Sequence, residues 1–237
     1  MLSAKSAQIR NMFSAIAYRY DLLNHLLSFN IDRLWRRKAV SLLGDAPVRN
    51  TGLWLDLCCG TADLALEMSR RSKAQIVGCD FSHPMLQIGR QKILTRNLGA
   101  RIQIIEGDGL NLPFRSQTFD AIGIAFGLRN LESVTGGLSE ICRVLRPGGR
   151  LIVLEFSKPT NPLFCKLFHF YFFNVLPAIG NRISKHKHAY TYLPNSVSHF
   201  PDQTELAKIL VHCGFQKVGL INLSGGIAAI HYGEREA

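Results

Sequence analysis

The chain has 237 residues, of which 47% are hydrophobic and 19% are charged, so it is long enough for one large α/β domain with a packed core. This composition excludes a largely disordered chain. With 28 Lys and Arg against 17 Asp and Glu, the net charge of +11 favours an anionic partner, whether a nucleic acid, an acidic membrane surface or an anionic ligand.

The N-terminus and the cysteines indicate a cytoplasmic protein with reduced thiols. The first ten residues, MLSAKSAQIR, lack the apolar core of a signal peptide. The six cysteines include no CxxC pair, and Cys58 and Cys59 are adjacent, which suits neither a disulfide nor a zinc site. The cluster Lys185–His188 contains two histidines, but its lysines oppose a metal ion, so we expect no metal site.

The apolar and helical patterns predict the following elements in chain order. A helical segment covers about residues 7–43, and short apolar runs then alternate with helical patterns. The predicted strands are Leu53–Leu57, Ala74–Cys79, Arg101–Glu106, Phe119–Phe126, Arg150–Phe156, Phe215–Leu223 and Ile227–Tyr232. The predicted helices after the first segment are Thr61–Arg71, Pro84–Asn97, Leu131–Leu145 and Gln203–Cys213, with Pro147-Gly148-Gly149 stopping the third.

This alternation predicts an α/β fold with a mostly parallel sheet covered by helices on both faces. Only Ser224, Gly225 and Gly226 separate the last two strands. A link of three residues allows a hairpin but not a crossover helix, so one terminal strand should run antiparallel to the rest.

Polar residues stand where three of the predicted parallel strands end, the edge at which open α/β sheets bind ligands. Asp56 closes the first strand and precedes Gly60 and Thr61, Asp80 closes the second, and Asp108 follows the third. Gly60 would let a ligand approach the backbone, and Thr61 would cap the next helix. Asp80 would hold ribose hydroxyls and Asp108 an adenine amino group; the alternative for each aspartate is a helix cap or a solvated loop residue.

The loop after the first strand is neither of two familiar nucleotide-binding loops. Cys58, Gly60 and Ala62 occupy the positions of the dehydrogenase G-x-G-x-x-G, and the P-loop sequence G-K-[ST] is absent. These departures count against dinucleotide binding and nucleoside triphosphate hydrolysis, and leave a nucleoside site of another kind.

A set of motifs in this order resembles class I S-adenosylmethionine methyltransferases. The cofactor half contributes WLDLCCGTADLA (54–65), CDFSHPML (79–86), GDGLNLPF (107–114), FDAIGIAFGLRN (119–130) and LRPGGRLIVLEFSKP (145–159). FGLRN together with LEFSKP resembles the UbiE/MenG family of ubiquinone/menaquinone C-methyltransferases, as do YRYDLLN (18–24), RLWR (33–36), YLPNS (192–196), FPDQ (200–203) and LSGGIAAIH (223–231). The resemblance covers nearly the whole chain.

The resemblance implies a Rossmann-like, seven-stranded sheet with an antiparallel last strand, S-adenosylmethionine as cofactor, and cofactor contacts at Thr61, Asp80, Asp108 and Gly109. Two residues depart from the family pattern. Ala62 stands where the family usually has glycine, and Ala125 stands where serine is common. We expect cofactor binding to survive the methyl group of Ala62, and we assign no contact to Ala125.

The resemblance also implies methyl transfer to a ring carbon of reduced demethylmenaquinone, and of a ubiquinone precursor. Attack by carbon needs an electron-rich ring, so the acceptor should be the quinol. Arg129 would stabilise a phenolate and Asn130 would orient it, since a protonated arginine is a poor base. Alternatively, Arg129 pairs with a carboxylate and Asn130 caps the helix predicted near Leu131.

The segment 157–200 contains five Lys and Arg and nine aromatic residues but no Asp or Glu. We expect it to form an insert over the active site of a single domain, 1–237, in which 1–50 is an N-terminal helical segment. Its composition suits a membrane surface or a polyprenyl tail, with a buried helix as the alternative. Tyr190 and Tyr192 would line the quinol pocket or fill the core. The most apolar run, Leu163 to Gly180, is too short and too polar to span a membrane.

Two other functions remain open on the sequence alone. The first is methylation of another acceptor, such as a small phenol, a sterol or RNA; the signature NPPY of amino-methylating enzymes is absent, and the positive charge keeps RNA in consideration. The second is a non-catalytic module that retains the cofactor fold. We expect a polyprenylated quinol, a membrane surface and no nucleic acid as partners, and the oligomeric state is left open.

Overall fold

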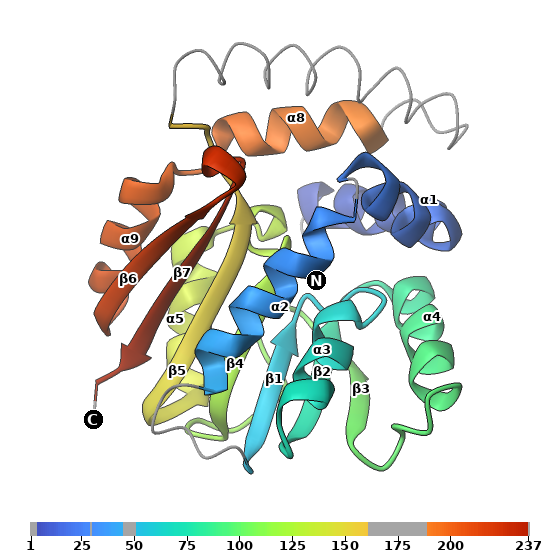
Figure 1. Cartoon of the computed structure of the whole chain (residues 1–237), viewed down its shortest axis with the longest axis horizontal. Helices are drawn as coiled ribbons and strands as arrows, with labels where there is room; N and C mark the ends of the chain where they lie inside the picture. Colours follow the sequence, from blue (N-terminus) through green and yellow to red (C-terminus); the bar gives the residue numbers. More distant parts are fainter. Residues whose placement is uncertain (1–3, 29, 45–50, 161–188, 237) are drawn as a thin grey trace.

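The computed structural model describes residues 4–28, 30–44, 51–160 and 189–236 (Figure 1). These residues form a seven-stranded sheet in the order β3-β2-β1-β4-β5-β7-β6. The strands are β1 (Leu53–Leu57), β2 (Gln75–Asp80), β3 (Ile102–Glu106), β4 (Phe119–Ala125), β5 (Leu145–Phe156), β6 (Phe215–Leu223) and β7 (Ala228–Arg235).

The direction of the strands agrees with the sequence prediction. β3, β2, β1, β4 and β5 pair in parallel, whereas β7 is antiparallel to both β5 and β6. The short 3-10 turn η3 (Ser224–Gly226) joins β6 to β7, which confirms that the link of three residues makes a hairpin. The predicted seven-stranded, mostly parallel sheet is therefore confirmed.

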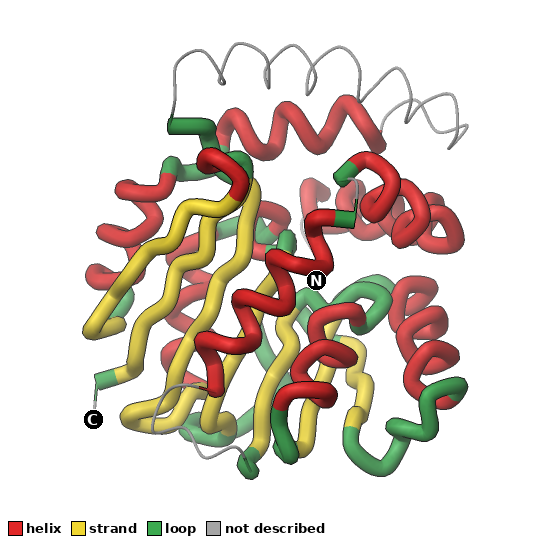
Figure 2. Tube along the Cα trace, in the orientation of Figure 1, coloured by secondary structure: helices red, strands yellow, loops and turns green. Residues whose placement is uncertain are grey.

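Helices cover both faces of the sheet (Figure 2). The helical elements are α1 (Ala4–Leu27), α2 (Ile31–Gly44), α3 (Asp63–Arg71), α4 (His83–Leu94), η1 (Leu128–Asn130), α5 (Val134–Val144), α8 (Ala189–His199) and α9 (Gln203–His212). Residues of α2, α3 and α4 pack into the core on one face, and residues of α5 and α9 into the core on the other. Neighbouring strand residues alternate between these cores: Ile152 and Leu154 belong to the first, Leu151 and Val153 to the second.

Three predicted boundaries are wrong. The segment 7–43 is two helices, since α1 ends at Leu27, α2 begins at Ile31 and Asn30 has a left-handed φ of 60°. The third predicted helix begins at Val134, not near Leu131, because Ser133 caps it by accepting a hydrogen bond from the Gly136 N–H. Residues 147–149 do not separate helix from strand; Leu145 already pairs with Phe119, and the register shifts before Ala121 pairs with Arg150.

α1 and α8 lie beyond the carboxyl ends of the parallel strands (Figure 1). Much of the predicted insert, residues 161–188, falls outside the described residues, as does the cluster Lys185–His188. Within the described ranges, no helix has the length and apolarity needed to cross a membrane.

Candidate active site

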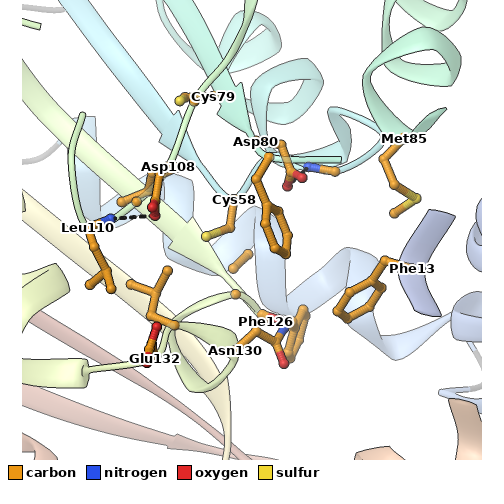
Figure 3. A pocket seen from close by; sticks show the side chains of 18 residues that line it. Phe13, Cys58, Cys79, Asp80, Met85, Asp108, Leu110, Phe126, Asn130 and Glu132 are labelled. Atoms are coloured by element: carbon orange, nitrogen blue, oxygen red, sulfur yellow. Dashed lines mark hydrogen bonds between the residues drawn. The ribbon is translucent and has the colours of Figure 1, made fainter. Parts of the chain in front are cut away.

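A pocket opens where β1, β2, β3 and β4 end, and α1 contributes to its wall (Figure 3). The empty space in the pocket, open mouth included, is about 700 Å³. The lining side chains and backbone come from Phe13, Leu57, Cys58, Gly60, Cys79, Asp80, Phe81, Met85, Gly107, Asp108, Gly109, Leu110, Ala125, Phe126, Gly127, Asn130, Leu131 and Glu132.

Asp80, the last residue of β2, is held by backbone donors on both carboxylate oxygens. The Gly60 N–H donates to Oδ2 and the Ser82 N–H to Oδ1, each over 2.9 Å. Burial raises the pKa of this carboxyl to about 6, against the lowering effect of these hydrogen bonds. Asp80 is therefore an oriented carboxylate at neutral pH, and each oxygen has a further lone pair for a ligand hydroxyl.

Asp108 lines the same pocket from the loop after β3. Its Oδ1 accepts the Leu110 N–H over 3.0 Å, which turns the loop back, and the backbone of Asp108 also pairs with Asn111. The adjacent Gly109 packs closely, since an added Cβ would lie 2.8 Å from Leu131. Asp80 and Asp108 thus meet in one pocket.

The loop between β1 and α3 turns tightly at three residues with positive φ. These are Cys58 (55°), Gly60 (52°) and Ala62 (67°). Gly60 lines the pocket, whereas Ala62 is fully buried and its methyl group faces Gly89 on α4, where an added Cβ would lie 3.3 Å away. The extra methyl of Ala62 therefore points into the helix packing and not into the pocket.

Thr61 and Asp56 lie outside the pocket lining. The Thr61 hydroxyl donates to Asp21 Oδ1 on α1 over 2.6 Å and accepts from Lys92 Nζ over 2.9 Å. Ala62, not Thr61, is the cap residue of α3. Our expectation that residue 61 would cap α3 is therefore wrong, and its side chain is not among those that line the pocket with Asp80 and Asp108.

Asp56 supports the loop from below. It is 1% exposed, and its Oδ2 accepts the Ala65 N–H in the first turn of α3 over 2.8 Å. Burial raises the pKa of its carboxyl to about 8. Its oxygen satisfies a backbone N–H in the first turn of α3, and its side chain is not among those that line the pocket.

Arg129 is paired with a carboxylate, as the alternative interpretation expected. Its guanidinium lies 2.6 Å from Glu155 Oε1 and donates to the Phe126 carbonyl over 2.7 Å. The Arg129 side chain is only 5% exposed and stacks over the Phe156 ring. It supports the pocket from behind Phe126 and does not line it.

Asn130 lines the pocket from η1 and does not cap α5. Its amide Nδ2 donates to the Phe126 carbonyl over 3.3 Å, and its Oδ1 accepts the Tyr192 hydroxyl over 3.0 Å. The Tyr192 ring, on α8, makes an edge-to-face contact with Phe13, with ring centroids 6.5 Å apart. Tyr192 therefore braces two lining residues without lining the pocket itself. Tyr190 lies in the first turn of α8, and its side chain is outside the described part of the structure.

Sequence reasoning missed the contribution of α1. Phe13 carries no motif that would assign it to a site, while Asp21 lies within the matched motif YRYDLLN without an evident role. Among the residues that the structure describes, no group of three or more His, Cys, Asp or Glu side chains is placed to hold a metal ion.

Comparison with known proteins identifies the family of the chain. The family model described as the ubiE/COQ5 methyltransferase family matches residues 1–235. Ubiquinone/menaquinone biosynthesis C-methyltransferase UbiE of Geotalea daltonii is 44% identical over 99% of both chains. Demethylmenaquinone methyltransferase of Staphylococcus epidermidis is 39% identical over 98% of this chain and 95% of the relative.

Two solved structures share the fold at low sequence identity. The [4+2]-cyclase SpnF superposes with a TM-score of 0.73 at 18% identity, covering 98% of this chain and 97% of its own. Phosphoethanolamine N-methyltransferase 2 of Haemonchus contortus, in complex with S-adenosyl-L-methionine, gives 0.62 at 12% identity, covering 85% of this chain and 52% of its own. The match over nearly the full length, with relatives of about 40% identity, places the chain in the ubiE/COQ5 methyltransferase family.

Proposed function

We propose that the chain transfers a methyl group from S-adenosylmethionine to a ring carbon of a reduced demethylmenaquinone, and of a ubiquinone precursor, in quinone biosynthesis. One observation carries the proposal: a single pocket has Asp80 and Asp108 at one end, and Phe13, Phe126 and Asn130, with Glu132 on the same side, at the other (Figure 3). The first end suits a nucleoside and the second a hydroxylated aromatic ring.

The residues present fit the cofactor. Asp80 would accept the ribose hydroxyls, because both of its oxygens are already oriented by backbone donors. Asp108 would accept from the adenine amino group, and the backbone of Gly60 and Gly109 lines the same pocket. When bound, S-adenosylmethionine supplies an electrophilic methyl group on a sulfonium; the protein supplies orientation and electrostatics.

The aromatic end would hold the acceptor ring. Phe13 and Phe126 offer apolar ring contacts, and Asn130 presents an amide whose second N–H would donate to a ring oxygen. A hydrogen bond to that oxygen stabilises negative charge as the phenolic proton leaves, which raises the electron density of the neighbouring ring carbon. Arg129 is paired with Glu155 and donates to the Phe126 carbonyl, so it would act by fixing that carbonyl and not as a base.

The activity is tested with purified protein, cofactor labelled in the methyl group, and a short-chain demethylmenaquinol kept reduced by dithionite. We expect label on a ring carbon with the quinol and none with the quinone, since only the quinol is electron-rich. Asp80→Asn, assayed at a cofactor concentration below its Kd, serves as the control with reduced labelling. Failure to transfer label to the quinol under reducing conditions, or label on an oxygen atom of the quinol, would contradict the proposal.

We propose that the chain forms one domain, 1–237, in which the insert 157–200 lies over the active site. We further propose that the protein is cytoplasmic and contacts the surface of the membrane. Exposed apolar side chains on α1 and α2 support this: Tyr18 is 90% exposed, Leu34 58% and Ile31 37%. Apolar side chains of this kind insert into the interface, while basic ones attract anionic lipid. Sedimentation with vesicles should increase with phosphatidylglycerol content; binding to RNA and not to vesicles would contradict it.

A further inference from the structure

Helix α1 is tied to the cofactor-binding end of the pocket by two polar side chains on one of its faces. The Ser14 hydroxyl lies 3.1 Å from the Ser82 hydroxyl, and Asp21 accepts from Thr61 over 2.6 Å. Ser14 and Asp21 are seven residues apart, so they lie on the same face of the helix, about 10 Å from each other along its axis. Ala17 lies between them on that face and is 2% exposed.

Of the two partners of α1, Ser82 is itself a donor that orients Asp80, and Thr61 is next in the chain to the other donor, Gly60. Ser82 donates its backbone N–H to Asp80 Oδ1, and its side chain contacts Ser14. Gly60 donates its backbone N–H to Asp80 Oδ2, and the next residue, Thr61, donates its hydroxyl to Asp21. Ser82 and the pair Gly60–Thr61 therefore each bind Asp80 through a backbone N–H and contact α1 through a side-chain hydroxyl.

Lys92 completes the link between Asp21 and the loop. Its ammonium group lies 2.6 Å from Asp21 Oδ2, 2.7 Å from Asp63 Oδ1 and 2.9 Å from the Thr61 hydroxyl. These contacts use its three donors. The three ionic side chains are only 19–24% exposed, so the attraction is screened less than between fully exposed groups.

The same helix supplies Phe13, which lines the aromatic end of the pocket and contacts the Tyr192 ring. We infer that Asp21 and Ser14 are positioning residues that couple the cofactor loop to α1, so that an occupied cofactor site holds Phe13 in place to form the acceptor site. This rests on the proposed function for the nature of the two ligands. Because coupling between two sites is reciprocal, each ligand raises affinity for the other by the same factor.

The primary test is hydrogen exchange of the α1 amides with and without S-adenosylhomocysteine, which needs no acceptor. We expect the product to slow exchange over residues 8–22 in the wild-type chain, and not in Ser14→Ala/Asp21→Ala. The single variant Asp21→Glu should retain part of the cofactor-dependent slowing, since it keeps the negative charge. Equal protection in the wild type and the double variant, or no protection in the wild type, would overturn the inference.

The matched control is Asp120→Asn, which removes the charge from an ion pair with Arg146 of 2.6 Å at the opposite end of the sheet. We expect α1 to be protected by cofactor in Asp120→Asn as fully as in the wild type. Loss of that protection would mean that hydrogen exchange reports a general loss of stability, and would overturn the inference. Ser14→Ala alone provides a milder variant if the double variant is unstable.

A second readout is the affinity for a quinol analogue measured with and without S-adenosylhomocysteine. We expect a coupling of about 5- to 150-fold in the wild type, the usual range for linked sites, and a ratio near one in the double variant. In turnover, the double variant should raise the acceptor KM more than it lowers kcat. If S-adenosylhomocysteine protects α1 in the wild-type chain but the chain methylates no quinol, the proposed function is contradicted while the coupling of α1 to the cofactor site stands.

Discussion

The guanidinium of Arg129 lies 2.6 Å from the Glu155 carboxylate, and the two side chains are 5% and 2% exposed. Glu155 Oε2 also accepts the Arg129 N–H, and its Oε1 accepts the Phe156 N–H. The pair thus joins the end of β5 to η1, which carries Asn130 into the pocket. Its charges are buried and depend on each other.

Glu155→Ala should destabilise the protein by about 3–5 kcal/mol, because it leaves a buried guanidinium without its counter-charge. Urea unfolding would measure the difference. Arg129→Met/Glu155→Leu should recover much of the loss, since no buried charge remains. The control is Glu106→Ala, which breaks a half-exposed contact with His83 and should cost less than about 1 kcal/mol. Equal costs for the two single variants would contradict this explanation.

Cofactor affinity should fall with pH below about 6, where the Asp80 carboxyl becomes protonated. The raised pKa means that the charged form, which accepts from ribose, is present above that pH and lost below it. Titration calorimetry with S-adenosylhomocysteine should show Kd rising toward tenfold per pH unit on the acid side. Asp80→Asn should bind about 10- to 100-fold more weakly and lose that pH dependence. An unchanged pH profile in the variant would exclude Asp80 as the titrating group.

Asp56→Asn should flatten the dependence of stability on pH. The unfolded carboxyl titrates near 3.8 and the folded one near 8, so the folded state binds a proton that the unfolded state has lost between these values. Stability contributed by this proton is present at acid pH and is lost as pH rises through about 8. Calorimetric melting should show that the free energy of unfolding of the variant, relative to that of the wild type, rises by on the order of a few kcal/mol between about pH 5 and about pH 9. Parallel curves would contradict the assignment.

Tyr192→Phe should weaken acceptor use while leaving cofactor binding unchanged. The hydroxyl donates to Asn130 Oδ1, so its loss frees the amide that would contact the acceptor, while the ring still packs on Phe13. We expect a fall in kcat/KM of about 2- to 10-fold, equivalent to one hydrogen bond. Initial rates at varied quinol, with Kd for S-adenosylhomocysteine as the control, would measure it. A change confined to cofactor affinity would contradict the assignment.

Features that depend on local pattern could be predicted from the sequence. The apolar runs located all seven strands, and the short link before Ile227 was sufficient to predict the antiparallel strand β7. Asp80 and Asp108 could be placed at one edge because parallel strands align their carboxyl ends. Such inferences need only the periodicity of the chain and the length of its connections.

Features that depend on the approach of distant segments could not be predicted. Thr61 turns away from the pocket because Asp21, 40 residues earlier, and Lys92, 31 residues later, lie on its other side. The partner of Arg129 is 26 residues away, and only the three-dimensional register shows that Glu155 is that partner and not a ligand contact. A residue type that suits a ligand suits an internal partner equally well.

The two thiols in the pocket wall have a further consequence. Burial raises the pKa of the Cys79 thiol to about 12 and that of the Cys58 thiol well above its usual value, and nearby Asp80 adds to both effects. Sulfur attacks an alkylating agent as the thiolate, so thiols whose pKa is raised in this way would be poor nucleophiles toward a donor bound in the pocket. The same acidic, enclosed surroundings that would receive the donor thereby protect the protein from methylating itself.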